Sequence, residues 1–134
     1  MKIFVDACPT RICFSEDTPR KFQIIHIESM PNIHCAEFLA IIVAMKNTRG
    51  NLDIYSDSKI IVDFINHQSN NVTHPRFGEM LKQFNALKFG RIVNVHWIPR
   101  ERNKAGKRLQ IVKAGFKKWI KSSDFTNNFE MAVK

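Results

Sequence analysis

The segment CAEFLAIIVAM, Cys35 to Met45, contains ten apolar residues and a single carboxylate, Glu37. Such a composition predicts a helix that is buried on nearly every side, because it leaves no polar stripe to face water. An ionised carboxylate that leaves water is costly unless it is paired or binds a metal. Glu37 is therefore expected either at the edge of the buried segment or next to a cation.

Strands and helices alternate on both sides of this segment. Alternating apolar residues predict strands at residues 2–7, 11–15, 21–29, 51–57 and 90–99, and helical spacing predicts helices at 33–47, 58–65, 76–88 and 103–121. Parallel neighbours in a sheet need long connections, so this order predicts an α/β domain whose central strands are joined by helical crossovers. We expect one domain at residues 1–121 and a C-terminal tail at 122–134.

Two acids lie at the ends of predicted strands. Asp6 and Asp57 each come two residues after an aromatic residue of the same strand phase, Phe4 and Tyr55. Ligands of α/β sheets gather at the carboxyl ends of the strands, and Glu37 lies near the start of the connecting helix. The three carboxylates are therefore expected to converge.

Converging carboxylates without a nearby base repel one another, so a divalent cation is the natural way to hold them together. Oxygen ligands favour a hard ion such as Mg²⁺ or Mn²⁺. Two such ions, about 4 Å apart, can support in-line displacement at a phosphodiester. We therefore predict Asp6, Glu37 and Asp57 as metal ligands and catalytic residues.

Each of these residues also has a simpler interpretation. Asp6 has the position of an ordinary turn acid, and Glu37 that of an acid near the N-terminus of a helix, favoured by the helix dipole. Trp97 and Trp119 have the strand or helix phase of core residues.

Positive charge is concentrated near the end of the sequence. Residues 91–121 contain ten Lys or Arg and one acid, so they carry the whole formal net charge of +9. A concentrated basic face is typical of a nucleic-acid-binding protein, although a solvated helix face gives the same pattern. The candidate nucleic-acid-binding residues are Arg100, Arg102, Lys104, Lys107, Arg108, Lys113 and Lys117.

The composition is that of a globular protein, with 44% apolar and 25% charged residues in a chain of 134. The longest apolar run is far shorter than the roughly 18 residues of a membrane span, and an acid at position 6 interrupts any signal-peptide pattern. Three cysteines form no even set and no metal-binding spacing. We expect a cytoplasmic monomer that does not interact with membranes.

Four motifs in this order resemble the ribonuclease H family. They are FVDACPT, IHCAEFLAIIVAM, IYSDSKIIVDFIN and VHWIPRERNKAGKRL, and the resemblance covers about residues 2–121. The first two are closest to the ribonuclease H domains of hepadnaviral polymerases and some retroelements. The resemblance implies a five-stranded mixed sheet flanked by helices. It also implies two-metal-ion hydrolysis, with Mg²⁺ or Mn²⁺, of the RNA strand of RNA/DNA hybrids, with double-stranded RNA as a further possible partner.

The sequence departs from the family at three places. RIC replaces Gly-Trp-Gly after the first motif, and PRER stands where many members carry a histidine. The family closes its site with a fourth Asp, but this position is Gly106 in one alignment and Lys107 in the other, which we favour because it keeps Leu109 in register. Asp63 and Glu101 are the nearest spare acids, and neither is expected to replace the missing ligand. A catalytically inactive nucleic-acid-binding module is the alternative function.

Overall fold

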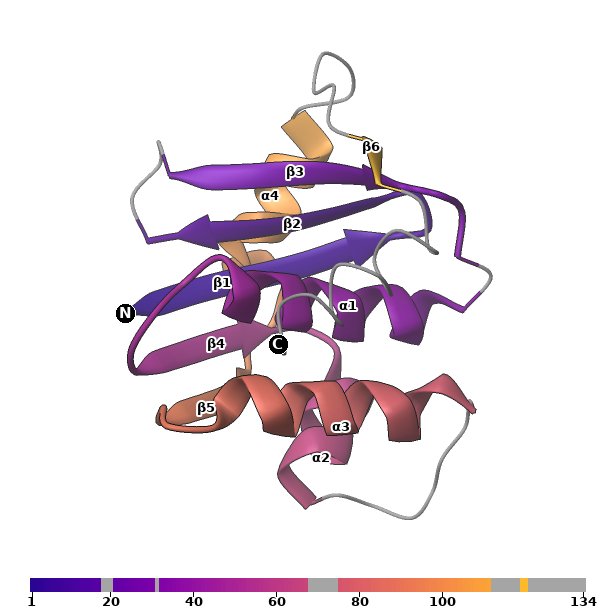
Figure 1. The fold of residues 1–134 in the computed structure, drawn as a ribbon. Coiled ribbons are helices and arrows are strands. Elements are labelled where there is room, and N and C mark those ends of the chain that lie inside the picture. Colours follow the sequence, from indigo (N-terminus) through magenta and orange to yellow (C-terminus); the bar gives the residue numbers. More distant parts are fainter. Residues whose placement is uncertain (18–20, 31, 68–74, 112–118, 121–134) are drawn as a thin grey trace.

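The computed structural model describes residues 1–17, 21–30, 32–67, 75–111 and 119–120. Strands and helices alternate as the sequence predicts (Figure 1). In chain order the elements are β1 (Lys2–Cys8), β2 (Arg11–Glu16), β3 (Phe22–Ile27), α1 (Ile33–Lys46), β4 (Leu52–Ser56), α2 (Lys59–His67), α3 (Arg76–Lys88), β5 (Val93–Trp97), a short 3-10 helix (Arg100–Arg102), α4 (Lys104–Ile111) and β6 (Trp119–Ile120).

The strands form one mixed sheet in the order β5-β4-β1-β2-β3-β6. β1 pairs antiparallel with β2, and β2 with β3, whereas β4 lies parallel to both β1 and β5. The predicted five-stranded mixed sheet is confirmed, and the two-residue β6 adds to it at the β3 edge. Because β1 and β4 are parallel neighbours, their carboxyl ends lie at the same edge of the sheet.

Helices cover both faces of the sheet, α1, α2 and α3 on one side and α4 on the other (Figure 1). The larger apolar core lies between the sheet and α1 and includes Phe38, Phe64 and Phe77. A smaller core under α4 contains Phe4, Cys13, Ile24, Ala105 and Leu109. β1 is therefore packed against an apolar core on each face of the sheet.

Helix α1 is buried on nearly every side, as its composition predicts. All its residues from Cys35 to Met45 are buried, including Glu37. Asn32 caps its first turn, where the side-chain Oδ1 accepts from the backbone N–H groups of His34 and Cys35 at 2.9 and 3.3 Å. Such a cap typically stabilises a helix by about 1 kcal/mol. Glu37 thus lies directly after the capped first turn of α1.

Arg91 fastens the last turn of α1 to the loop before β4. Its Nε donates to Gly50 O at 2.7 Å, and its two terminal nitrogens donate to Met45 O at 2.9 Å and Thr48 Oγ1 at 3.0 Å. Gly50 has a positive φ of 74°, a conformation that favours glycine. Arg91 thereby satisfies a helix carbonyl that has no partner within the helix.

Replacing Arg91 by Ala is expected to lower the free energy of unfolding by about 2 kcal/mol, because three hydrogen bonds are lost at a partly exposed site. Arg91→Lys should recover only part of this, since an ammonium cannot reproduce the planar fork. Urea unfolding measures the difference. The control is Arg49→Ala at a nearby exposed position. Equal losses from Arg91→Ala and Arg49→Ala would contradict the assignment.

The last predicted helix is wrong in its extent. The prediction places one helix at residues 103–121, but α4 spans Lys104–Ile111, and Trp119–Ile120 is a strand parallel to β3. The open edge of β3 offers backbone hydrogen bonds, and aromatic and β-branched residues favour strands, so pairing outweighs the helical spacing here. Residues 112–118 and the predicted tail at 122–134 lie outside the described residues.

Candidate active site

Three carboxylates meet at the carboxyl ends of β1 and β4. Each of Asp6, Glu37 and Asp57 offers an oxygen that lies within 4.8 Å of the corresponding oxygens of the other two. Asp6 comes from β1, Asp57 directly follows β4, and Glu37 comes from the crossover helix α1. The predicted convergence is therefore observed. Asp63 and Glu101 are exposed, and neither belongs to this group within the described part of the chain.

Burial makes the carboxylate group electrostatically unfavourable by itself. Asp6 and Glu37 are only 6% and 7% exposed. Desolvation, followed by the charges of Asp6 and Asp57, raises the pKa of Glu37 to about 10. Desolvation and the charge of Asp57 also raise the pKa of Asp6 to about 6. At neutral pH the group therefore holds protons that a bound cation would displace.

The unsatisfied atom of the group is Glu37 Oε2. This oxygen is buried and has no hydrogen-bond partner among the described residues. A buried polar atom without a partner is costly, and a divalent cation on this oxygen would remove the cost. The residues present thus fit a hard cation: they supply oxygen donors from three separate segments of the chain, and one of them, Glu37, has an oxygen without a partner.

Asn103 positions Asp57 from the start of α4. Its Nδ2 donates to Asp57 Oδ2 at 3.1 Å and to Val5 O at 2.8 Å, while its Oδ1 accepts from the backbone N–H of Ala105 at 3.1 Å. Asn103 is completely buried. One side chain therefore starts α4, ties it to β1 and fixes one carboxylate of the site.

Gly106 is the residue of α4 that lies against the carboxylates. A Cβ built on Gly106 would be 3.0 Å from Asp6 Oδ2. Lys107, the position favoured by the sequence alignment, is exposed and lines the neighbouring cavity. The rotation of α4 about its axis therefore brings Gly106, and not Lys107, next to Asp6.

A cavity of about 960 Å³ opens beside Asp6. Acidic, basic and small residues line it, namely Asp6, Ala7, Cys8, Arg11, Arg100, Glu101, Gly106, Lys107 and Leu109. The charge of Arg100 acts on the carboxylates, since it lowers the pKa of both Asp6 and Glu37. An anionic group that enters the cavity would meet positive side chains next to the carboxylate group.

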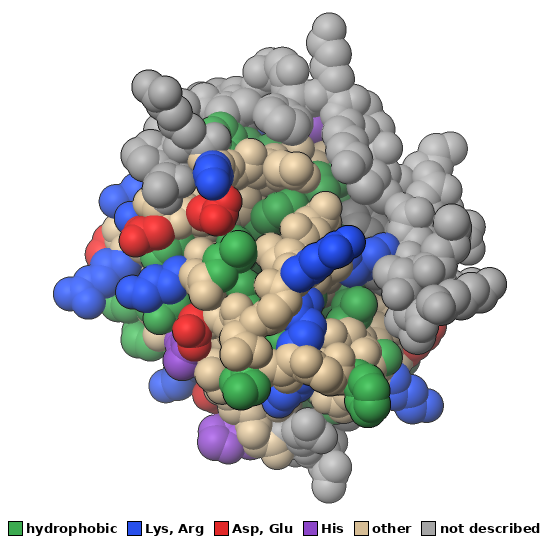
Figure 2. All heavy atoms as spheres, turned by 60° about the vertical axis from the view of Figure 1, so that its left-hand side comes forward, with side chains coloured by type: hydrophobic (Ala, Val, Ile, Leu, Met, Phe, Trp, Pro, Cys, Tyr) green, Lys and Arg blue, Asp and Glu red, His purple; other side chains and the backbone are tan. Residues whose placement is uncertain are grey.

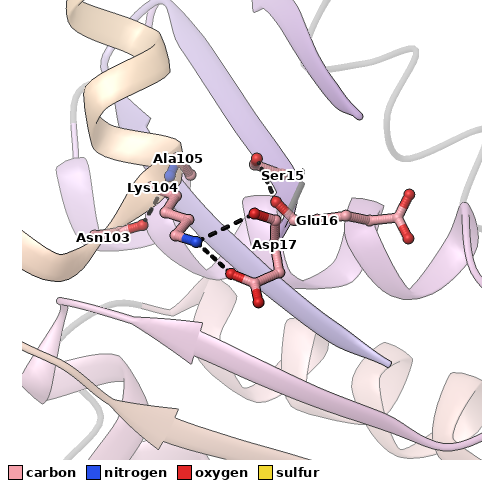
Figure 3. A network of polar contacts seen from close by, with 6 residues as sticks. All are labelled: Ser15, Glu16, Asp17, Asn103, Lys104 and Ala105. Atoms are coloured by element: carbon pink, nitrogen blue, oxygen red, sulfur yellow. Dashed lines mark hydrogen bonds and ion pairs between the residues drawn. The ribbon is translucent and has the colours of Figure 1, made fainter. Parts of the chain in front are cut away.

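Two of the predicted nucleic-acid-binding residues are used inside the domain. Lys104 donates to the carbonyl and carboxylate of Asp17, after β2 (Figure 3), and lies 5.6 Å above the Phe4 ring. Arg108 lies 5.4 Å above the Phe22 ring. Both side chains hold α4 on the sheet, so we expect a smaller contribution from them to binding.

Of the other predicted binding residues, Arg100, Arg102 and Lys107 are exposed, and Lys113 and Lys117 lie outside the described residues. Figure 2 shows the side of the domain on which β1 begins, where Lys and Arg side chains are interspersed with acids. Arg100 and Lys107, in contrast, line the cavity near the carboxyl end of β1. The described basic residues best placed for a polyanion are therefore those beside the carboxylates.

Trp97 does not have the predicted core position. Its side chain is 49% exposed, and its indole Nε1 donates to Asp57 O at 3.2 Å. β5 is an edge strand and Trp97 is its last residue, so the ring has fewer neighbours than the strand phase implies. Trp97 is thus an exposed aromatic residue next to Asp57. The strand pattern predicts a buried ring and therefore does not identify Trp97 as a candidate for substrate contact. The side chain of Trp119 lies outside the description.

Comparisons with known proteins agree with this architecture. Residues 22–109 match the model of the reverse transcriptase-like family. LC11-RNase H1, solved in complex with an RNA/DNA hybrid, superposes with a TM-score of 0.66 at 19% identity over 81% of this chain and 91% of that chain. The N-terminal RNase H domain of rv2228c from Mycobacterium tuberculosis gives a TM-score of 0.63 at 19% identity over 99% and 97% of the two chains.

A third solved structure, RNase H1 from Halobacterium salinarum, has a TM-score of 0.65 at 12% identity over 81% of this chain and 90% of that chain. No curated protein sequence matches the chain. The fold is that of these ribonuclease H structures, with an acidic group where β1 and β4 end. The chain belongs to the reverse transcriptase-like family. Within its described parts, no helix is long and apolar enough to cross a membrane.

Proposed function

We propose that this chain is a divalent-metal-dependent nuclease that hydrolyses the RNA strand of an RNA/DNA hybrid. The observation that carries the proposal is the group of Asp6, Glu37 and Asp57, in which each residue offers an oxygen within 4.8 Å of those of the other two, and Glu37 also has a buried, unpartnered oxygen, Oε2. These residues would hold Mg²⁺ or Mn²⁺. Such an ion supplies an activated water and countercharge for a phosphodiester.

The chain's own side chains have distinct roles in this function. Asp6 and Glu37 provide buried oxygens, and Asn103 fixes the orientation of Asp57 through its hydrogen bond to Oδ2. Arg100 and Lys107 line the cavity beside Asp6, where they can bind backbone phosphates without reading bases. Binding is therefore expected to depend on the phosphate backbone and on the shape of the duplex, and to weaken as salt concentration rises.

The hybrid is chosen as substrate because LC11-RNase H1 has been solved with one. At 19% identity that likeness concerns the fold, and the hybrid is our inference for the substrate of this chain. Double-stranded RNA is the nearest competitor, because its A-form geometry resembles that of a hybrid, and a protein distinguishes the two through the 2′-hydroxyl groups.

One observation favours a second function, that of a nucleic-acid-binding module without catalysis. Helix α4 brings Gly106 against Asp6 and places Lys107 in the cavity, so it adds no fourth carboxylate. With fewer ligands, the site holds metal more weakly and orients it less strictly. The binding surface would be the same in both functions.

An RNA/DNA hybrid labelled separately on each strand distinguishes the two functions. Incubation with Mg²⁺ or Mn²⁺ is expected to cut only the RNA strand, and EDTA or Asp6→Asn should abolish the cut. Double-stranded RNA, single-stranded RNA and double-stranded DNA of the same sequence serve as comparison substrates. Tight binding of the hybrid without cleavage in either metal would establish the binding module instead. Failure to bind any of these nucleic acids would contradict both functions.

A further inference from the structure

Helix α4 approaches the carboxylate group with its backbone and not with a ligand. At Gly106 a Cβ would lie 3.0 Å from Oδ2 and 3.7 Å from Cγ of Asp6, so the glycine fills the place from which an α4 side chain would reach the group. Cation sites of hard ions depend on oxygen ligands from all sides. The α4 side of this site lacks one.

Asn103 closes the same side from the neighbouring turn. Its Nδ2 donates to Oδ2 of Asp57 at 3.1 Å, and its Oδ1 accepts from the backbone N–H of Ala105 at 3.1 Å. The amide nitrogen carries hydrogens and cannot bind a cation. Oδ2 of Asp57 is thus engaged by a neutral donor, the amide nitrogen of Asn103 cannot be a ligand, and its oxygen already accepts one hydrogen bond.

Two positive side chains line the cavity next to the carboxylate group, on the side where a second ion would need ligands. Arg100 and Lys107 are exposed and line the cavity next to Asp6 and Gly106. A second divalent ion there would be repelled by both cations and would lack protein oxygens on the α4 side. A phosphate oxygen, in contrast, would be attracted by the same two groups.

We propose that this site takes one divalent ion, on Asp6, Glu37 and Asp57, and that Lys107 and Arg100 contact the substrate phosphate in place of a second ion. The inference rests on the proposed metal-dependent function and deepens it. With one ion, the formal charges of the three carboxylates, the two cations and one phosphodiester cancel, and the opposite charges of Arg11 and Glu101, which also line the cavity, cancel each other. A second ion would leave an excess of positive charge.

Counting bound ions tests the first half of the proposal. The full chain is titrated with Mn²⁺, and free Mn²⁺ is followed by electron paramagnetic resonance at neutral pH. One ion per chain is expected for the wild type, and Gly106→Asp is expected to add a second, weaker site. Because the new Cβ is tightly placed, thermal unfolding confirms that this variant is folded, and Lys107→Asp provides a second way to add an acid.

The outcomes separate this inference from the proposed function. Two ions bound by the wild type would overturn the inference while leaving metal-dependent cleavage intact. One ion without any hybrid cleavage would support the ion count and contradict the nuclease function. If millimolar Mn²⁺ does not bind at all, both the inference and the metal-dependent function are wrong.

The phosphate contact is tested by binding without metal. Lys107→Gln should lower affinity for an RNA/DNA hybrid roughly three- to tenfold near 0.1 M salt and reduce the slope of log affinity against log salt by about one, because one phosphate contact is lost. Lys88→Gln is the matched control, an exposed lysine of α3 in the opposite helix layer. Equal affinity and slope in Lys107→Gln and wild type would overturn the contact.

Discussion

Glu37→Gln is expected to abolish metal-dependent cleavage, with a loss on the order of a thousandfold or more. The substitution keeps the size of the buried side chain and replaces one carboxylate oxygen by an amide nitrogen, which cannot bind a cation. Metal ions contribute several kcal/mol of transition-state stabilisation, and about 4 kcal/mol corresponds to a thousandfold change in rate. Single-turnover cleavage of the hybrid measures the loss, and Mn²⁺ titration measures the accompanying loss of ion affinity.

Glu79→Gln is the matched control, because it makes the same chemical change at an exposed position in the first turn of α3. It should leave both cleavage and ion binding unchanged within experimental error. Binding of the hybrid without metal should remain close to wild type in both variants, since the phosphate contacts are made elsewhere. If Glu37→Gln bound Mn²⁺ with wild-type affinity, Glu37 would not be a ligand, and the role proposed for its unpartnered oxygen would be wrong.

The convergence of Asp6, Glu37 and Asp57 could be predicted from sequence because it follows from topology. Two acids lie at the ends of strands in the same phase, and the helix that leads from β3 into the second of these strands carries a single acid near its start. Parallel pairing of β1 and β4 then brings the strand ends together, whatever the details of packing. The burial of the helix was equally predictable, since it has no polar face, whereas the sequence left open whether Glu37 lies at its edge or next to a cation.

The position that faces Asp6 from α4 could not be predicted in the same way. Residue matching favours Lys107, but the rotation of α4 is set by Asn103, whose side chain starts the helix and is anchored on Val5 and Asp57. This phase brings Gly106 against Asp6. An alignment compares residue types along the chain, whereas the rotation of a short helix depends on tertiary hydrogen bonds made by one residue.

The engagement of Lys104 and Arg108 was also invisible in the sequence. A run of cations after β5 indicates a basic face, but it does not say which members cover Phe4 and Phe22 or pair with Asp17. Long cationic side chains can pack their stems on apolar surface and still carry charge. Only the packing of α4 on β1 and β2 separates these two residues from Arg100 and Lys107, which line the cavity.

Without metal, the protein is expected to become less stable as the pH rises from 5 to 8. In the folded chain, burial raises the pKa of Glu37 from 4.5 to about 10 and that of Asp6 from 3.8 to about 6. The unfolded chain loses these protons near pH 4, so the stabilisation is complete below that pH and is lost as the pH rises towards the folded values. Each pH unit costs about 1.4 kcal/mol per group that keeps its proton, which amounts to about 4 kcal/mol for Glu37 over this range and about 1 kcal/mol more for Asp6 below its folded pKa.

Thermal unfolding in EDTA, compared with unfolding in Mg²⁺ across the same pH range, measures this effect. Added Mg²⁺ should raise the Tm more at pH 8 than at pH 6, because an ion that displaces protons binds better when protons are scarce. Glu37→Gln should flatten the pH dependence in EDTA. Lys104 lowers the pKa of the exposed Asp17, so the stabilisation from this acid is lost only in more acidic solution. Equal pH dependence in Glu37→Gln and wild type would show that Glu37 is already ionised in the folded chain, which requires a cationic partner other than the metal.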